Sequence, residues 1–359
     1  PTVYHLSPRH EGLTLAATLK ELVPDTSWNS AKRWIAKRQV QVNGNLCLDE
    51  ARRVKEKDVV KLWPQPLAKP IDTRDLKVAF VDEHLIVVEK PAGVTSVRHF
   101  AERKISTRRR QLQPTVEELL PPLLAKLQQM RWPPLPPKGM NRGKKHGPPQ
   151  GKPGRAIQNA KKLPPQLQVL PVHRLDRDTS GLMLFARTRE AEQKLVGMFR
   201  RHTIEREYMG VCLGRIQPQT IQSQLVRDRG DGIRGSLPSG ADAELQNSAR
   251  HAITHVLAAE PFHPPGSDQE YSLIRCKLET GRTHQIRIHL SEAGHMLCGD
   301  KIYFRDATGS TTSDPSGAPR HALHSDRLTF THPITGQHLQ LKMPLPPDLA
   351  RWLKKLRQA

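Results

Sequence analysis

A polar turn between two apolar runs carries the residues with the clearest chemical potential. The turn, Pro171–Gly181, lies between Leu167–Val172 and Leu182–Ala186. The second run is typical of a buried strand, so the turn is expected at a strand end, supported by a sheet. It holds Asp176 between two arginines, and nearby cations favour the charged form of a carboxylate. That arrangement suits a nucleophile, and on chemistry alone it equally suits a structural ion pair.

The turn contains one of several short motifs that follow one another along the chain in a fixed order. The motif in the turn is His173–Leu182. The others are Lys90–Gly93 before it and Glu205–Val211, Thr280–Leu290, Cys298–Tyr303 and Arg320–His324 after it. Together they resemble the ordered motifs of the RluA-type pseudouridine synthases, enzymes that isomerise uridine within RNA. The likeness runs from about residue 76 to residue 353 and is interrupted by two insertions.

The resemblance implies a reaction and a carboxylate that drives it. The bond between uracil N1 and ribose C1′ is broken, the base rotates, and it is rejoined through C5. Asp176 matches the family's catalytic position because it directly follows Arg174 and Leu175. Asp178 is the rival on spacing alone. Whether the carboxylate attacks the base, attacks the sugar or abstracts a sugar proton stays open.

Two more residues receive catalytic roles from the same resemblance. Arg287 matches the arginine that pairs with the catalytic aspartate, and a guanidinium suits this because it is always charged and can bond in two places. Arg282 is the alternative and could instead hold phosphate. Tyr208 matches the active-site tyrosine, which would stack on the flipped base. Its hydroxyl is also a candidate for removing the C5 proton.

The residues beside Asp176 are candidates for RNA contact. His173 and Arg174 are placed to fill the space left by the base, with Arg174 the better candidate for insertion. Two other functions are weighed against the enzyme. A non-catalytic RNA-binding assembly factor or chaperone would not need Asp176, Tyr208 and Arg287 together, and an RNA hydrolase would need a metal cluster or a His–Lys set that the sequence does not offer.

The charge of the chain favours a polyanionic partner. Lys and Arg number 57 against 35 Asp and Glu, giving a net charge of +22 and a pI near 10.2. Such an excess binds nucleic acid through phosphate contacts. The resemblance implies ribosomal RNA as the partner, with tRNA as the alternative, and we expect a monomeric protein without metal or cofactor. Four scattered cysteines and the absence of a long apolar segment or visible signal peptide predict a reduced, cytoplasmic protein.

The first 68 residues are predicted to form a separate RNA-binding domain. Two helices, Leu15–Val23 and a second one capped by Asn29 or Ser30, precede a hairpin at Val40–Leu46. This order resembles the S4 RNA-binding domain. The implied RNA-facing surface carries four basic residues: Lys32, Arg33, Lys37 and Arg38.

The rest of the chain, residues 74–359, is predicted to form an α+β catalytic domain with a large mixed, mainly antiparallel sheet. Many short strands with a few helices, including Thr115–Gln129, indicate that class. A basic segment rich in Pro and Gly at about 131–165 departs from the family pattern, and it would either grasp RNA or act as a spacer. A second, polar insertion at about 231–250 is expected to be a surface loop.

Overall fold

The chain divides into two compact units that are interleaved in sequence. The structure, a computed structural model, describes residues 1–43, 45–65, 67, 72–98, 114–134, 163–230, 232–304 and 312–358. One unit comprises 1–74 and 98–164, and the other comprises 75–97 and 165–359. Residues 98–164, assigned from the sequence to the catalytic domain, thus group with the first unit. The basic runs Arg103–Arg110 and Lys138–Lys162 lie outside the described residues.

The N-terminal part of the first unit is a small sheet with two helices. Its strands follow the order β1-β4-β2-β3, and its apolar core includes Leu15, Leu19, Ile35 and Val60. Ser27, and not Asn29 or Ser30, caps the second helix, because its Oγ accepts the Ser30 N–H at 3.1 Å. The elements are β1 (Thr2–His5), α1 (Leu15–Leu22), α2 (Trp28–Ala36), β2 (Val40–Val42), β3 (Asn45–Leu46) and β4 (Val59–Leu62).

A further helix in this unit, α4 (Val116–Leu127), begins where the sequence predicted. Thr115 caps it, and the Glu118 carboxylate accepts a hydrogen bond from the Thr115 backbone N–H at 3.0 Å, which completes a capping box. The same carboxylate binds the Arg98 guanidinium at 2.8 Å. These local bonds fix the first turn of the helix.

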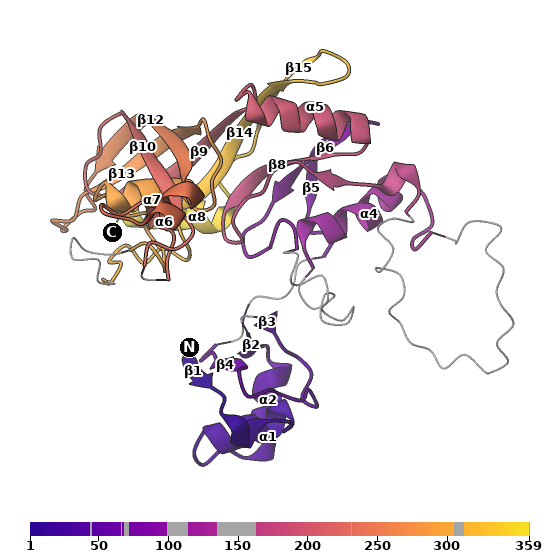
Figure 1. Ribbon diagram of the computed structural model, residues 1–359, viewed down its shortest axis with the longest axis vertical. Coiled ribbons are helices and arrows are strands. Elements are labelled where there is room, and N and C mark those ends of the chain that lie inside the picture. Colours follow the sequence, from indigo (N-terminus) through magenta and orange to yellow (C-terminus); the bar gives the residue numbers. More distant parts are fainter. Residues whose placement is uncertain are drawn as a thin grey trace, which may run out of the picture. The chain divides into compact units, whose positions relative to one another are not determined.

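The second unit is built on a sheet of 11 strands (Figure 1). The strand order is β11-β10-β12-β13-β9-β14-β8-β6-β5, with β15 paired to β14 and β7 to β8. Among the described strands, every pairing is antiparallel except that of β14 with β8. The predicted α+β fold with a mixed, mainly antiparallel sheet is therefore confirmed. The strands are β5 (Lys77–Val81), β6 (Leu85–Lys90), β7 (Leu170–Pro171), β8 (Ser180–Ala186), β9 (Glu205–Leu213), β10 (Gln219–Val226), β11 (Gly235–Ser236), β12 (Arg250–Phe262), β13 (Tyr271–Leu278), β14 (Leu323–Thr331) and β15 (His338–Lys342).

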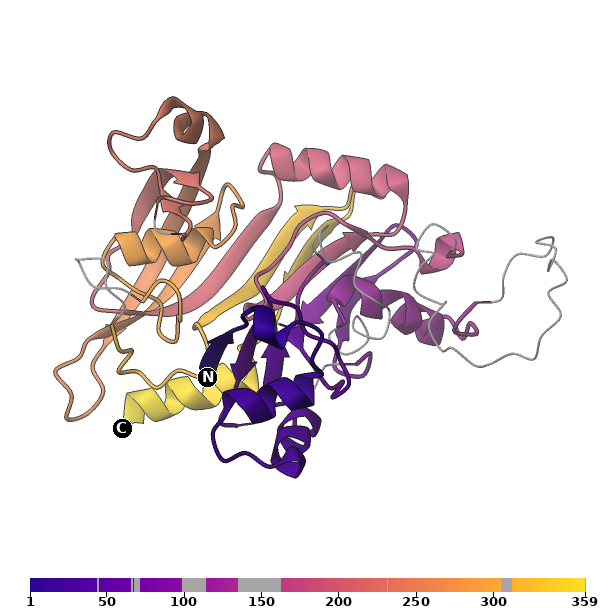
Figure 2. The same ribbon diagram turned by 60° about the horizontal axis from the view of Figure 1, so that its bottom comes forward.

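Helices cover both faces of this sheet. Helix α5 (Arg189–Arg200) packs Ala191 and Leu195 onto β6, β8 and β14, and α7 (Gln285–Glu292) packs Ile288 near β10 and β12. Helix α8 (Pro347–Gln358) packs Trp352 against a different cluster that includes Val211 of β9. Figure 2 shows α5 and α8 on opposite sides of the strands. None of the described helices is long and apolar enough to span a membrane.

The polar insertion expected as a surface loop contains regular structure. Within 231–250, β11 pairs with β10, and a short helix, α6 (Ala243–Ser248), starts at the Asp242 cap. Asp242 accepts the Leu245 N–H at 2.7 Å and so nucleates a helical turn that composition does not reveal, and no residue of this short helix is buried.

Strand β8 is the central support of the polar turn that precedes it. All seven of its residues are buried, which explains the continuous apolar run in the sequence. Gly181 pairs with Ser325 of the parallel strand β14 and has φ +134°. A Cβ at this position would collide with the Ser325 backbone and Cβ, so the two strands can approach only because residue 181 is glycine.

Gly181→Ala should lower the free energy of unfolding by about 3 kcal/mol or more, because it adds a steric clash to an unfavourable φ. Gly336→Ala is the matched control, since Gly336 has φ +76° and its Cβ would meet nothing within 4 Å. The control should lose only about 1–2 kcal/mol. Urea unfolding of both variants measures the difference, and equal losses would contradict the close approach at β8.

Candidate active site

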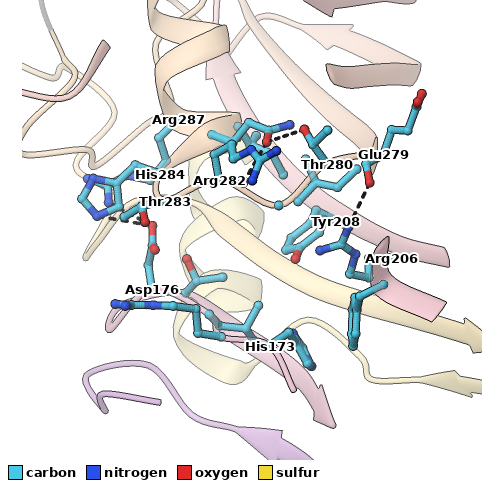
Figure 3. Close-up of a pocket in the computed structure, with 18 of the residues that line it drawn as sticks. His173, Asp176, Arg206, Tyr208, Glu279, Thr280, Arg282, Thr283, His284 and Arg287 are labelled. Atoms are coloured by element: carbon cyan, nitrogen blue, oxygen red, sulfur yellow. Dashed lines mark hydrogen bonds and ion pairs between the residues drawn. The ribbon is translucent and has the colours of Figure 1, made fainter. Parts of the chain in front are cut away.

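A large cavity lies where the polar turn, β9 and the start of α7 meet. Its volume is about 540 Å³, and it is lined by residues from 172–179, 196–208 and 278–287, together with His251 and Leu323. Figure 3 shows Asp176, Tyr208 and Arg287 among the side chains that surround it. Asp178, the rival carboxylate, is exposed and is not among the lining residues.

The Asp176 carboxylate is held by a guanidinium that serves two acids. Arg287 Nη1 lies 3.1 Å from Asp176 Oδ2, while its Nε and Nη2 bond both oxygens of Asp300 at 2.6 and 2.9 Å. The Arg287 side chain is 6% exposed and Asp300 is 1% exposed, whereas Asp176 is 17% exposed. The bidentate pair is therefore buried, and the carboxylate that remains open to the cavity is Asp176.

Asp300 is an anchor for this arginine. Its Oδ1 also accepts the backbone N–H groups of Ile302 and Tyr303 at 2.9 and 3.0 Å. Burial alone would raise the pKa of Asp300, but the hydrogen bond and charge of Arg287 outweigh burial and lower that pKa below its usual value. The Tyr303 ring lies under the guanidinium, with 5.0 Å between Arg287 Cζ and the ring centroid.

His284 completes the group around Asp176. Its Nε2 is 3.8 Å from Asp176 Oδ2, and its Nδ1 is 2.9 Å from the Tyr303 hydroxyl. The backbone of His284 is left-handed, with φ 61°, a conformation that costs a non-glycine residue about 1–2 kcal/mol. Burial lowers the pKa of His284, so the imidazole is neutral near pH 7 and its contact with Asp176 is not an ion pair.

The turn that carries Asp176 is fixed by bonds to its backbone. Lys90 is fully buried, and its Nζ donates to the carbonyls of Pro91, Arg177 and Thr179 at 3.0, 2.9 and 2.7 Å. Burial lowers the pKa of Lys90 to about 7, against the opposing effect of the nearby carboxylates. Ser96 bonds both the N–H and the carbonyl of Leu175. These bonds hold the turn at the position from which Asp176 enters the cavity.

Two side chains of β9 form the opposite wall of the cavity. Tyr208 is buried, and burial raises the pKa of its hydroxyl, so the phenol stays protonated at neutral pH. Arg206 lies over the Phe199 ring at 5.3 Å and donates to the Glu279 carbonyl at 3.2 Å. Burial lowers the pKa of Arg206. The motif arginine thus braces the wall beside the tyrosine.

The residues predicted to contact RNA in this unit all line the cavity, but they differ in exposure and in the hydrogen bonds that they make. Arg174 and Arg282 are exposed, and Arg282 Nε bonds the His251 carbonyl at 3.0 Å. His173 Nε2 accepts the Leu184 N–H at 2.9 Å, and burial lowers the pKa of His173 to about 3. The lone pair of that nitrogen is therefore already used in a hydrogen bond within the protein, and His173 stays neutral.

The predicted residues of the first unit form a group at the end of α2. Lys32, Arg33 and Lys37 are exposed. Lys32 lies 3.4 Å from Glu50, a contact between side chains that are half exposed. Arg38 is only partly exposed, and its Nε donates to the Leu67 carbonyl at 3.1 Å. That bond ties Arg38 to the chain that follows β4.

The sequence did not single out several residues that the fold brings to Asp176. His284 and Asp300 lie inside quoted motifs, and so do Lys90 and Tyr303, yet none was given a role. The available signal was their presence in those motifs. Among the described residues, no cluster of three or more side chains is arranged to hold a metal ion.

Asp300→Asn should lower the free energy of unfolding by about 3 kcal/mol at pH 7, because it leaves Arg287 buried with a weaker partner. The difference from the wild type should shrink as the pH falls through the Asp300 pKa, which the Arg287 guanidinium holds below its usual value. A carboxyl whose pKa is depressed by folding stabilises the protein above its unfolded pKa and loses that effect in acid.

Urea unfolding at pH 7 and below pH 4 measures both effects. Glu192→Gln is the control, because it removes an acid from a surface pair with Arg189 at 2.7 Å. It should lose less than about 0.5 kcal/mol. An Asp300→Asn loss as small as that of the control would contradict the anchoring role.

Comparison with known proteins places the chain in a family. The family model described as RNA pseudouridylate synthase matches residues 137–292. The Nitrosomonas europaea protein named ribosomal large subunit pseudouridine synthase D is 30% identical over 369 residues, covering 96% of this chain and 85% of that protein. A protein of the same name from Xanthomonas campestris is 28% identical, covering 97% of this chain and 90% of that protein.

Solved structures agree at the level of the fold. The structure titled human RNA pseudouridylate synthase domain containing 4 has a TM-score of 0.52 at 17% identity and covers 78% of this chain and 92% of that one. The relatives span nearly the whole sequence, and the fold is the one that the ordered motifs implied. The chain belongs to the RluA-type family of RNA pseudouridine synthases, isomerases that convert uridine in RNA to pseudouridine.

Proposed function

We propose that this chain isomerises a uridine of large-subunit ribosomal RNA and that Asp176 is the group that acts on the nucleotide. The observation that carries the assignment is the open Asp176 carboxylate, which Arg287 holds at 3.1 Å on the wall of a cavity of about 540 Å³. A cavity of that size can take a flipped nucleotide. The proposal excludes Asp178, which lies outside the cavity wall.

Each of the three catalytic candidates has a task that its surroundings suit. Asp176 acts on the sugar or the base, and Arg287 keeps it charged and oriented after the nucleotide has expelled water. Tyr208 offers its ring to the flipped base from the opposite wall (Figure 3). Stacking on an aromatic face is the usual way to hold a base outside its helix.

The RNA backbone is bound by cations around the cavity. Arg174, Arg200 and Arg282 line it, and none of them makes an ion pair with another described residue. Elsewhere on α5 the cations are neutralised, because Arg189 pairs with Glu192 and Lys194 with Glu190. Unpaired arginines at the cavity are suited to phosphate. We assign Arg174 to the space that the base leaves, with His173 as a neutral neighbour.

The choice of RNA rests on the relatives. Several relatives that align with 96% or more of this chain carry a name that specifies the large ribosomal subunit. A tRNA substrate is the alternative. Pseudouridine mapping of ribosomal RNA and tRNA from cells that lack this gene decides between them, because the missing site names the substrate.

The N-terminal part of the first unit is proposed to be an S4-like RNA-binding domain. Its two helices, its small sheet and the exposed cations Lys32, Arg33 and Lys37 support this. Cations grouped at one helix end suit phosphate and shape more than base sequence.

We also propose a cytoplasmic location. Cys47, Cys212, Cys276 and Cys298 are free thiols and all are buried. Burial raises the pKa of Cys212 to about 12, which makes its thiol unreactive. Free thiols in such number are typical of a reducing compartment.

Asp176→Asn should abolish release of tritium from RNA labelled at uridine C5, while RNA binding stays within a few-fold. The change removes the acting carboxylate and leaves the phosphate-binding arginines in place. Asp178→Asn is the matched control and should remain active. Substantial activity in Asp176→Asn, or an inactive Asp178→Asn, would refute the assignment.

Changing Lys32, Arg33 and Lys37 together to glutamine should weaken RNA binding and flatten its salt dependence. The slope of log K against log salt should fall by up to about 0.9 for each phosphate that the variant no longer neutralises. The control changes Lys20, Lys55 and Lys57 to glutamine, which removes the same charge from other positions of this unit. Equal effects in both triple variants would show a general charge effect and no defined surface.

A further inference from the structure

We propose that Arg320 is a positioning residue for the reaction, whose guanidinium holds the turn that carries Asp176. Asp348, in the first turn of α8, holds this guanidinium in its place. The proposal rests on the proposed role of Asp176 as the group that acts on the nucleotide. Arg320 is not among the described residues that line the cavity, so it acts on the substrate only through the turn.

The turn is bonded by a second cation besides Lys90. Lys90 Nζ bonds the carbonyls immediately before and after that of Asp178. The Asp178 carbonyl between them accepts from Arg320 Nη1 at 2.8 Å, and Arg320 Nη2 donates to the Ser180 hydroxyl at 3.0 Å. Three consecutive carbonyls are thus bonded by two buried cations, which leaves the backbone that follows Asp176 little freedom to move.

The backbone of Arg320 packs against the segment that anchors Arg287. Gly299 has φ +75°, and a Cβ at this position would collide with the Arg320 carbonyl. The next residue along the chain, Asp300, holds Arg287 in the bidentate pair. Arg320 therefore touches both segments whose relative position sets the contact between Asp176 and Arg287.

Asp348 keeps the Arg320 guanidinium in this position. The Arg320 side chain is 9% exposed, and a buried guanidinium needs an acidic partner. Asp348 Oδ2 accepts from Arg320 Nε at 2.7 Å and Asp348 Oδ1 accepts from Nη2 at 3.3 Å, so the contact has two points. Burial alone would raise the pKa of Asp348, but the hydrogen bond and charge of Arg320 outweigh burial and lower that pKa. The carboxylate is therefore charged at neutral pH.

Helix α8 has other contacts that attach it to the sheet. Trp352 packs in the cluster that includes a residue of β9, and its Nε1 donates to the Ser316 carbonyl at 2.9 Å. A second ion pair joins Arg357 of this helix to Glu260 of β12 at 2.9 Å. Within the described part of the chain, that pair makes no bond to the turn. The attachment of α8 and the position of the turn can therefore be tested separately.

Asp348→Asn tests the proposal, because the side chain keeps its shape but loses its charge and one acceptor oxygen. The single-turnover rate constant at saturating RNA should fall by about tenfold, since a small displacement of the acting group is costly. The RNA concentration that gives half of the maximal rate should stay within about twofold, because Asp348 is not among the cavity-lining residues. Asp348→Glu keeps the charge and should recover most of the rate constant.

Glu260→Gln is the matched control, because it removes the acid from the other ion pair of α8. It should leave the rate constant unchanged, and the melting temperatures of both variants report any loss of stability. A contact that only stabilises the fold would change the melting temperature and not the rate constant of the folded enzyme. The proposal is overturned by an unchanged rate constant in Asp348→Asn, by equal losses in both variants, or by a loss confined to RNA affinity.

A double variant shows whether Asp348 acts through Arg320. In Arg320→Lys a single ammonium replaces the planar fork, so it cannot bond Asp348 at two points and the Asp178 carbonyl at the same time. Arg320→Lys should lose at least as much rate as Asp348→Asn, and the double variant should lose no more than Arg320→Lys alone. Losses that multiply would contradict the coupling. The Asp348 side chain is 40% exposed, so the comparison with Glu260→Gln decides the matter even where Arg320→Lys does not fold.

Asp176→Asn distinguishes failure of this proposal from failure of the proposed function. That variant should be inactive with either residue at position 348. An active Asp176→Asn would remove the basis of both proposals. An inactive Asp176→Asn together with a fully active Asp348→Asn would reject the positioning role of Arg320 alone.

Discussion

One buried guanidinium shared by two carboxylates is the interaction on which this site depends. Arg287 bonds Asp300 at two points and Asp176 at one. The buried charges of Arg287 and Asp300 are costly unless each is bonded, and the bidentate Asp300 contact removes the freedom of the arginine side chain. The remaining N–H then points at Asp176 without further reorganisation. Because Arg287 sits on the first turn of a buried helix, the packing of α7 sets the position of Asp176's partner.

The turn that carries Asp176 is stabilised through its backbone. Lys90 donates hydrogen bonds to three backbone carbonyls, and Ser96 bonds both the N–H and the carbonyl of Leu175. These backbone groups therefore have protein partners and do not need hydrogen bonds from the substrate or from water. The cost is a lysine buried in the protein with a pKa of about 7. The binding of a flipped base that we propose for this cavity would gain from such rigidity, because the geometry exists before the RNA arrives.

The arginines of the cavity differ in whether an acidic side chain pairs with them. Inside the cavity, Arg287 is matched by acids, whereas Arg174, Arg200 and Arg282 at its lining have no acidic partner among the described residues. The buried acids fix geometry, and we propose that the unpaired arginines bind phosphate. Part of the net charge of +22 therefore comes from arginines at the cavity that pair with no described acid.

The sequence alone determined the family motifs, the fold class and the strand that supports Asp176, because apolar runs and turn residues report burial locally. It did not predict β10, whose mainly polar residues hide a strand, or the helix within 231–250. Only the tertiary structure decided which motif residues meet. Arg287 and Asp176 are 111 positions apart, and Lys90 lies 87 positions from Arg177. Their contacts follow from strand register and from the approach of β8 to β14 at Gly181, which no local pattern encodes.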